Sequence, residues 1–305
     1  MALSPRLPLF EDETVRSWIE RLTAFHGPAS VDDLCRQLGI NYEGLRFGER
    51  DDIFRLGDIT GESPALIHRN LLSLTRTGGQ RIGPHALTHI LRPLDERHIC
   101  LRCLRQDAKG GPPGFHLRER WEWRLTTSQH CSRHGCELTR IDVPGDDWRE
   151  EIALNAVTRP KRQEGTRAED LFHTWLCGEI STRSGRGWTA AMSLPAAVDA
   201  VGVIGATLGL GIRDRWQDLE FRDRQRALNA GYTLLCLDKA ALRPALFAGF
   251  GKKIQTFGQA RNHGNPMGAL WSWMRNRQTL APTDPLAAEI FATFEEVQAL
   301  AGTVS

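Results

Sequence analysis

The sequence has no long apolar run and almost no net charge. Its longest apolar segment, residues 200–211, is far shorter than the roughly 20 residues needed to cross a bilayer. Arg6 and the acids from Glu11 onward interrupt the start of the chain, so the apolar stretch of a signal peptide is also missing. Bulk charge does not indicate nucleic acid, because 39 basic residues stand against 37 acidic ones. We therefore expect a soluble, cytoplasmic protein with no membrane partner.

Cysteine is sparse in this chain. Seven cysteines are spread over 305 residues, and this odd, thin distribution excludes a disulfide-stapled secreted scaffold. In a reducing compartment, two cysteines close together in sequence indicate metal binding or redox chemistry instead.

The nucleotide-binding patterns typical of many enzymes are incomplete. Residues 249–253 (GFGKK) lack the four-residue spacer and the hydroxyl of a phosphate loop, so nucleotide hydrolysis would have to come from a partner. Residues 209–211 (GLG) are too short for a dinucleotide fingerprint. The chain also has no internal repeat and no low-complexity segment.

The length allows about two domains of roughly 150 residues, or one with elaborations. Apolar periodicity predicts a mainly α fold in three parts. We expect an N-terminal helix-turn-helix-like bundle over residues 1–97, a central zinc-finger segment over residues 98–157, and a C-terminal helical domain over residues 158–305. The polar stretches 158–170 and 181–189 are predicted to be connections.

Two amphipathic helices are predicted near the N-terminus. The first begins at a cap on Glu11 or Asp12 and ends at Gly27. Its apolar residues recur at spacings of three and four and are Val15, Trp18, Ile19, Leu22 and Phe25. The second helix is capped by Ser30 and ends at Gly39.

Residues 51–74 predict two helices around a turn at residues 60–62. Ser63 at the N-cap and Pro64 at the first helical position are typical of a helix start. Such a pair resembles a helix-turn-helix, but it reflects simple packing of two helices more often than DNA recognition. The residues that would face DNA are His68, Arg69 and Asn70, with Arg76 just beyond.

Five further helices are predicted in the C-terminal part. They cover residues 195–208, 216–235, 238–247, 267–277 and 284–300. The first carries Gly202, Gly205 and Ala206, small residues that allow another helix to approach closely.

Four residues of the central segment have the spacing of a metal site. Cys100 and Cys103 form one C-x2-C pair, and Cys131 and His134 form a C-x2-H pair 27 residues later. Thiolates and imidazole are the ligands that suit zinc, and structural zinc takes four of them in a tetrahedron. We therefore predict one structural Zn²⁺ ion. A site closed by four protein ligands leaves no place for a reactive water, so a zinc enzyme would require one of them to be absent.

Other interpretations of these cysteines remain open at the sequence level. Cys136 competes with His134 as the fourth ligand, and His98 and His130 are spare imidazoles. A C-x-x-C redox motif expects a strand before it and a helix opening at it, and the polar run upstream of Cys100 makes a poor strand. The cysteines could also be unliganded parts of the core.

Three pieces of the chain occur in an order typical of one known family. Residues 13–22 (ETVRSWIERL) are similar to an opening motif ES-x-x-SW-[LI]-x-RL, and residues 99–107 (ICLRCLRQD) to CPxCLxxD. Residues 116–138 are similar to a tryptophan-containing segment that ends in CxxHGxxL. Over residues 7–140, with a weaker echo at residues 227–235, the chain resembles the TniQ family, which includes target selectors of the TnsD type.

The resemblance implies a non-enzymatic adaptor in DNA transposition. Members of the family help to choose the insertion site, either by binding DNA or by linking a targeting complex to an AAA+ regulator ATPase and the transposase. Some associate as dimers with an RNA-guided Cascade complex. The expected partners are therefore DNA, the AAA+ regulator, the transposase, a Cascade complex and a second copy of the chain.

Two departures from the family pattern affect these expectations. Thr14 stands where serine is usual, which is a mild change. Residues 139–151 lack the second C-x-x-C that often follows the HGxxL motif, so we expect one zinc ion rather than two.

The central segment is locally basic. Between Cys100 and Arg140, eight basic residues stand against four acidic ones and are interleaved with Trp121 and Trp123. This composition suits a nucleic-acid surface, but a solvated face around two core tryptophans has the same pattern. An alternative function is a stand-alone, sequence-specific DNA-binding regulator that uses the helix-turn-helix.

Overall fold

The structure is a computed structural model, and it describes most of the chain. The described residues are 3–93, 96–141, 148–149, 152, 170–182, 188–189, 192–237, 239–258, 267–280 and 285–302. The chain divides into two compact units, residues 1–168 and 169–305. The predicted division at residues 157/158 falls outside the described residues, and the one at residues 97/98 stays a prediction.

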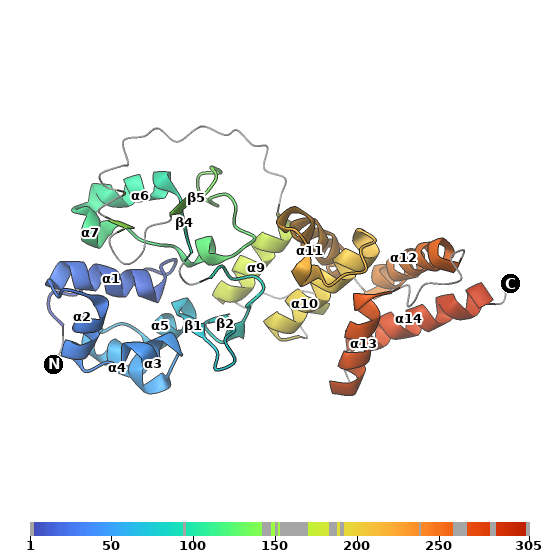
Figure 1. The fold of residues 1–305 in the computed structure, drawn as a ribbon, viewed down its shortest axis with the longest axis horizontal. Coiled ribbons are helices and arrows are strands. Elements are labelled where there is room, and N and C mark those ends of the chain that lie inside the picture. The colour runs from blue at the N-terminus through green and yellow to red at the C-terminus, as the bar shows by residue number, and fades with distance from the viewer. Residues whose placement is uncertain are drawn as a thin grey trace. The chain divides into compact units, whose positions relative to one another are not determined.

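Short helices form the first half of the N-terminal unit (Figure 1). They are α1 (Val15–His26), α2 (Val31–Leu38), α3 (Tyr42–Arg46), α4 (Arg50–Thr60) and α5 (Pro64–Asn70). Ser30 caps α2 and Gly39 ends it in the left-handed conformation, as expected. The predicted cap of α1 was wrong: Thr14, rather than Glu11 or Asp12, accepts a hydrogen bond from the Ser17 N–H at 3.1 Å.

Helices α4 and α5 are joined by the predicted turn, where Gly61 adopts a left-handed conformation with φ of 79°. The second helix is shorter than expected and ends at Asn70. Residues 72–74 instead form β1 (Leu72–Leu74), which pairs antiparallel with β2 (Gln80–Ile82), and β2 pairs with β3 (His85–Ala86). The strands were missed because each is only two or three residues long and shows no clear alternation.

The second half of the N-terminal unit contains the central segment. Its elements are β4 (Arg97–Ile99), α6 (Leu101–Asp107), η1 (Ala108–Gly110), α7 (Pro113–His116), η2 (Trp121–Arg124) and β5 (Thr139–Ile141). Strand β4 pairs antiparallel with β5, with Ile99 opposite Thr139. A separate core here includes Ile99, Leu104, Trp123 and Trp148 together with the buried cysteines.

Helix α1 joins the two halves of this unit and lies between them in Figure 1. Its apolar face, including Trp18 and Leu22, packs into the core formed with α2, α4 and α5. Its polar face carries Glu20, which is 3% exposed and binds Arg97 and Arg149 of the central segment. Burial alone would raise the pKa of Glu20, but the guanidiniums of Arg97, Arg149 and Arg16 hold that pKa below its usual range.

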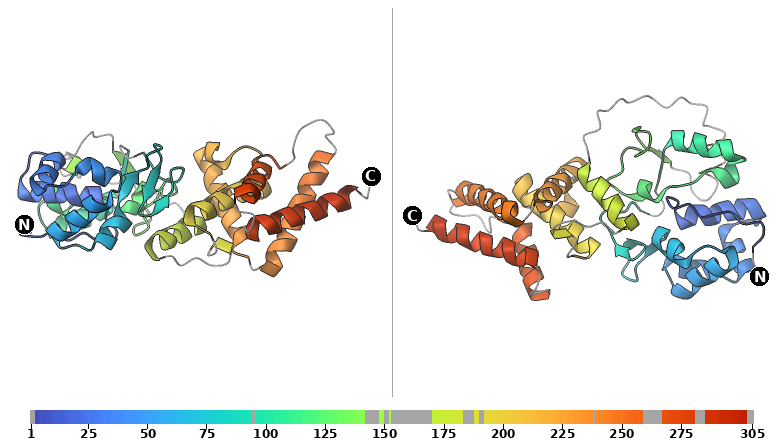
Figure 2. Two further views of the ribbon diagram at one scale, coloured as in Figure 1. Left: turned by 90° about the horizontal axis from the view of Figure 1, so that it is seen from below. Right: turned by 180° about the vertical axis from the view of Figure 1, so that it is seen from behind.

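The C-terminal unit is built from helices. They are α9 (Leu171–Thr182), α10 (Leu194–Ile204), η5 (Trp216–Asp218), α11 (Phe221–Leu235), α12 (Lys239–Gly258), α13 (Ala269–Leu280) and α14 (Pro285–Gly302), with a π-helical turn η4 (Gly205–Gly209) continuing α10. Helix α12 packs along α14, as Figure 2 also shows. All five predicted C-terminal helices are present with shifted bounds, and α12 runs past the predicted end at residue 247.

Helix α9 was not predicted, although its sequence contains the signal. Phe172, Trp175, Leu176 and Ile180 are buried and recur at helical spacing. The helix starts immediately after the polar stretch 158–170, which was expected to be a connection.

Small residues allow α10 and its π turn to approach α11 closely. A side-chain carbon added at Gly205 would lie 1.8 Å from the Ala227 carbonyl oxygen, and one added at Gly231 would lie 1.9 Å from the Val201 carbonyl oxygen. Gly202 makes room in the same way for the Trp216 ring. The close packing expected at Gly202 and Gly205 is therefore confirmed.

The described residues thus form a mainly helical protein with two small sheets, in agreement with the predicted fold class. None of the described helices is both long enough and apolar enough to span a membrane.

Candidate metal centre

The first pair of cysteines lies where β4 ends and α6 begins. Cys100 is the N-cap of α6, and its sulfur accepts a hydrogen bond from the Cys103 N–H at 3.4 Å. The first turn of the helix therefore directs the Cys100 and Cys103 sulfurs to the same side. Both side chains are fully buried.

The second pair lies in a tight loop between η2 and β5. The Cys131 N–H donates to the Cys136 carbonyl at 2.8 Å, and the Gly135 N–H donates to the Cys131 carbonyl at 2.8 Å. Gly135 has φ of 63°, a left-handed conformation that glycine adopts without the cost other residues pay. Because β5 follows this loop and pairs with β4, the short sheet brings the two loops together.

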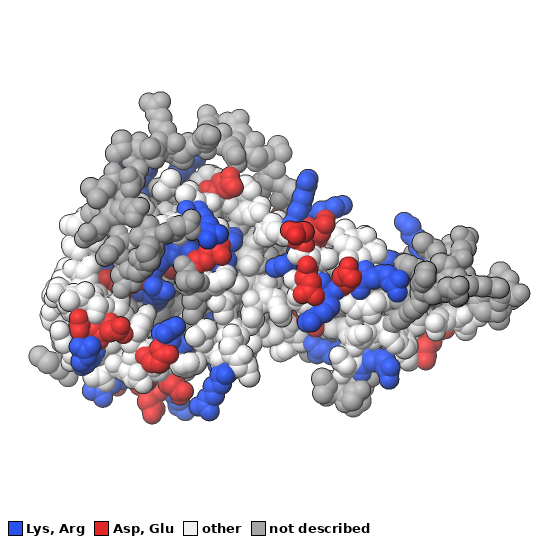
Figure 3. All heavy atoms as spheres, viewed as in Figure 1, with Lys and Arg blue, Asp and Glu red and all other residues white. Residues whose placement is uncertain are grey.

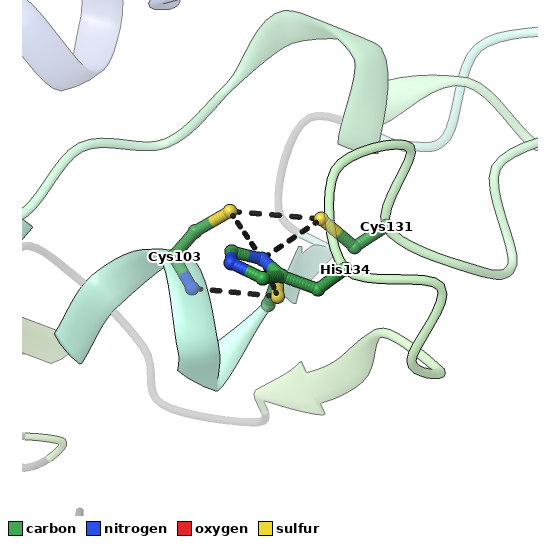
Figure 4. Close-up of side chains that lie close together, drawn as sticks. Cys103, Cys131 and His134 are labelled. Atoms are coloured by element: carbon green, nitrogen blue, oxygen red, sulfur yellow. Dashed lines mark hydrogen bonds between the residues drawn. The ribbon is translucent and has the colours of Figure 1, made fainter. Parts of the chain in front are cut away.

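The four predicted residues meet at one point (Figure 4). The Nδ1 atom of His134 lies 3.5 Å from the Cys100 sulfur, 3.3 Å from the Cys103 sulfur and 3.6 Å from the Cys131 sulfur. The sulfurs of Cys103 and Cys131 are 3.6 Å apart. All four donor atoms lie within 4.8 Å of one another. The repeated two-residue spacing, together with the family resemblance, predicted this set.

These separations fit a tetrahedral zinc site. With Zn–S bonds of about 2.3 Å and Zn–N bonds of about 2.0–2.1 Å, two sulfurs of a tetrahedron lie about 3.8 Å apart, and a sulfur and a nitrogen about 3.6 Å apart. The Cys103–Cys131 separation and the three His134 separations agree with these edges to about 0.3 Å. Three sulfurs and one imidazole nitrogen are also the donor set that zinc prefers.

The electrostatics of the cluster also favour a cation. Hydrogen bonds from Cys103 and Cys131 lower the pKa of the Cys100 thiol. For Cys103, the hydrogen bonds with Cys100 and Cys131 raise the pKa of the thiol. One sulfur thus takes the negative charge at the expense of a neighbour. Three thiolates packed this closely in a buried site need a divalent cation to offset their repulsion.

Cys136, the alternative fourth ligand, lies beside the cluster. Its sulfur is 3.4 Å from the Cys100 sulfur, but it does not join the mutually close set. Burial raises the pKa of Cys136 to about 12, which favours a neutral thiol. The spare histidines are also placed elsewhere, since His98 contacts Glu96 at 2.6 Å and His130 is exposed.

One argument against a redox motif was wrong. Strand β4 directly precedes Cys100 and α6 opens at it, which is the local setting that a C-x-x-C redox pair expects. The surroundings of the pair distinguish a metal site from a redox pair, because the Cys103 sulfur lies 3.6 Å from the Cys131 sulfur and 3.3 Å from the His134 Nδ1 atom. A dithiol redox pair does not require that convergence.

A residue overlooked in the sequence supports the imidazole. The side-chain amide of Gln106, one helical turn beyond Cys103, lies 3.0 Å from the Nε2 atom of His134. When Nδ1 faces the sulfurs, Nε2 carries the proton, and the amide oxygen of Gln106 would accept it once the amide is oriented accordingly. The i+3 spacing from Cys103 could have identified this residue, because it places both side chains on one face of α6.

The first family motif is buried against the central segment. Thr14 donates from its hydroxyl to Glu119 at 3.3 Å, and Ser17 accepts from the Glu119 N–H at 2.9 Å. Glu13 accepts from Arg21 at 2.7 Å, and Arg21 also donates to the Phe115 carbonyl at 2.9 Å. The motif therefore holds α1 against residues 115–119, and threonine performs this role in place of serine.

Two of the basic residues beside the tryptophans are buried rather than exposed to solvent. Arg120 and Arg124 are 1% and 2% exposed, and Trp121 and Trp123 belong to the buried residues. Arg120 binds Asp107 at 2.9 Å. On the face shown in Figure 3, basic and acidic side chains are interspersed. The alternative of core tryptophans is thus the better description of residues 118–124.

The predicted DNA-facing residues of the helix-turn-helix are only partly exposed. Asn70 is fully buried and donates to the carbonyls of Phe10 and Glu11, so its expected outward position was wrong. Arg69 contacts the Asn70 side chain at 3.3 Å. Arg76, in the turn between β1 and β2, is 91% exposed.

The fold is mainly helical, and its central segment contains a buried cluster of three cysteines and one histidine. Residues 4–138 match the family model described as TniQ, so the chain contains a TniQ family domain, as the sequence motifs indicated. Proteins of this family are transposition accessory proteins with no known catalytic role. The chain has no significant match among curated proteins or among solved structures.

Proposed function

We propose that this protein is a zinc-stabilised accessory factor of DNA transposition that helps to select the target site. It would link target DNA or a targeting complex to an AAA+ regulator ATPase and the transposase, and it would not be an enzyme. The observation that carries this proposal is the TniQ domain over residues 4–138 together with the convergence of its two cysteine-containing motifs on one point.

In this proposal Cys100, Cys103, Cys131 and His134 hold one structural zinc ion. The ion supplies no reaction, because four protein ligands leave no open position for water. Its role is to stabilise the loops on either side of the β4–β5 pair. Since the ligands come from two loops 27 residues apart in sequence, metal binding energy becomes folding energy of the intervening residues.

The fourth ligand is tested by zinc content. His134→Ala is expected to reduce bound zinc, whereas Cys136→Ser should retain one ion per chain. The two variants form a matched pair, because both residues lie in the loop after Cys131. Full zinc content in His134→Ala together with loss in Cys136→Ser would contradict the proposed ligand set.

The adaptor role is tested by reconstitution. The tagged full-length protein, the AAA+ ATPase and the transposase of the same element should co-purify, and transposition into the native target should require all three. Replacing wild-type protein with Cys100→Ser should abolish target-selective insertion while transposase cleavage persists. Transposition that stays target-selective without this protein would exclude the role.

DNA affinity separates the adaptor from a stand-alone regulator. An adaptor is expected to bind duplex DNA weakly, with an affinity that falls steeply as salt rises. The buried Asn70 side chain and the interspersed surface charges favour this outcome. Tight, sequence-selective binding by the isolated protein at 150–200 mM salt would instead support the regulator. A Cascade complex and a second copy of the chain are further partners to include in the reconstitution.

A further inference from the structure

A pocket in the N-terminal unit lies outside the metal cluster. It has a volume of about 260 Å³ and is formed by α1, α3, the start of β1 and residues 119–124. Its volume exceeds the roughly 150 Å³ apolar cavity that holds one benzene molecule, but falls below the 300–1,000 Å³ typical of cofactor and drug-sized sites. The pocket is thus the size of one or two side chains.

One part of the pocket wall is apolar. Val15 and Ile19 of α1, Leu45 of α3 and Leu71 line it, and each is at most 6% exposed. These side chains already belong to the core between the helices, so the wall is held in place by packing. A large apolar side chain entering here would gain burial without displacing the fold.

The remaining wall carries three arginines, each of which already has an acidic partner. Among the described residues that line the pocket, Arg16, Arg46 and Arg124 stand against one acid, Glu119. The side chains of Arg16 and Arg46 are 37% and 45% exposed, which places them where a ligand can reach them. Arg46 pairs with the exposed Glu43 at 2.9 Å, a surface contact that is easily exchanged.

Arg124 also lines the pocket, and its side chain is buried and paired with Glu119 at 3.4 Å. Its terminal nitrogens bind the carbonyls of Glu96 and Pro93, while its Nε–H has no hydrogen-bond partner within the described structure.

We propose that this pocket binds a short segment of a partner protein in which a single acidic residue stands next to a large apolar one. The apolar side chain would rest on Ile19 and Leu45, and the carboxylate would pair with Arg46 and Arg16. Buried pockets that combine apolar, tyrosine and arginine side chains are where interface energy concentrates, and Tyr42 also lines this one.

A peptide fits this site better than a nucleic acid. A phosphodiester strand carries a charge at every nucleotide and would run across the exposed acids Glu43, in α3, and Glu49, just after it. A single carboxylate needs only the guanidiniums at the pocket. The inference does not rest on the proposed function, because no lining residue belongs to the metal cluster.

Fluorescence anisotropy of the full-length protein with defined peptides tests the proposal. The probes are ten-residue labelled peptides that contain one Asp or Glu beside one Leu, Phe or Trp. Two matched panels replace the acid with its amide or the apolar residue with Ser. Binding by the first panel, with at least a tenfold loss in either matched panel, is the expected result.

Variants assign the binding to the pocket. Arg46→Glu should weaken binding at least tenfold, and Leu72→Trp, which fills the pocket from β1, should do the same. Arg36→Glu is the control, because Arg36 is also an exposed helical arginine paired with an acid three residues earlier. Circular dichroism checks that all three variants fold.

Three results would overturn the proposal. The first is no binding by any peptide up to millimolar concentration. The second is equal loss in Arg36→Glu and Arg46→Glu. The third is that a ten-nucleotide single strand, but none of the peptides, binds with the dependence on Arg46, which would assign the pocket to nucleic acid.

Discussion

The two units of this protein differ in the interactions that stabilise each of them internally. In residues 1–168 the central segment depends on sulfur and imidazole atoms, a buried Glu20 with its arginines, and a two-strand ladder. In residues 169–305 the helices pack through apolar side chains and through glycines where backbones approach closely. Stability of the first unit should therefore depend on metal and pH, whereas stability of the second should depend on side-chain volume.

Removing zinc should produce the largest difference in stability between the two units. Structural zinc in small finger domains contributes apparent binding energies of about 10–16 kcal/mol, so Cys100→Ser or chelation should unfold the central segment. Hydrogen exchange should show lost protection over residues 97–141 and retained protection over α10 and α11. Cys236→Ser, at an exposed thiol, is the control and should change neither. Protection retained over residues 97–141 after complete zinc removal would refute the prediction.

Glu20 should make the N-terminal unit sensitive to acid. Its carboxylate is ionised and paired in the folded state, and its lowered pKa means that this stabilisation is present above the ordinary glutamate pKa, near 4.3, and is lost as the pH falls below it. We expect Glu20→Gln to lower the free energy of unfolding by about 3–5 kcal/mol at pH 7.

The difference in unfolding free energy between Glu20→Gln and wild type should shrink as the pH falls below about 4. Denaturant titrations across pH measure this difference for the N-terminal unit. Glu43→Gln is the control, because Glu43 forms an exposed pair and should contribute less than about 1 kcal/mol. A pH-independent cost at Glu20 would contradict the assigned pairing.

The close approach of α10 and α11 at Gly205 and Gly231 should make the stability of the C-terminal unit sensitive to added side-chain volume. Gly205→Ala places a methyl group against the Ala227 carbonyl and should cost about 1–3 kcal/mol of unfolding free energy. Gly251→Ala in α12 is the matched control: nothing lies within 4 Å, so alanine should stabilise the helix by about 0.5–1 kcal/mol. Zinc content should be unchanged in both, and thermal melts would show whether the signs differ as expected.

Replacing Gln106 should have the smallest effect, and it should change only the affinity for zinc. Residues that orient a zinc ligand typically change metal affinity by about 10- to 100-fold, so Gln106→Ala should weaken zinc binding by that factor without unfolding the segment at saturating zinc. Competition with a chromophoric chelator measures the affinity. Gln129→Ala, at another exposed glutamine, should leave it unchanged. Equal affinity in both variants would remove Gln106 from the site.

The sequence was informative wherever a feature depends on residues close together in the chain. The Ser30 and Gly39 helix limits follow from capping, and most helices follow from apolar periodicity. It was less informative where short strands form only by pairing with a distant partner, as in β4 and β5. Asn70 shows the same limit, because its burial depends on carbonyls about 60 residues earlier in the chain.

By itself the sequence determined the helical class, the two cysteine-containing motifs that could hold a metal and the order of the family motifs, because each depends on residue type and spacing. The tertiary structure decided that His134 rather than Cys136 faces the three sulfurs, that Arg120 and Arg124 are buried, and that a pocket lined by arginines and apolar side chains opens beside α1 and α3. These features depend on contacts between segments tens of residues apart. The spacing of residues along the chain does not reveal whether a side chain faces such a distant segment or points away from it.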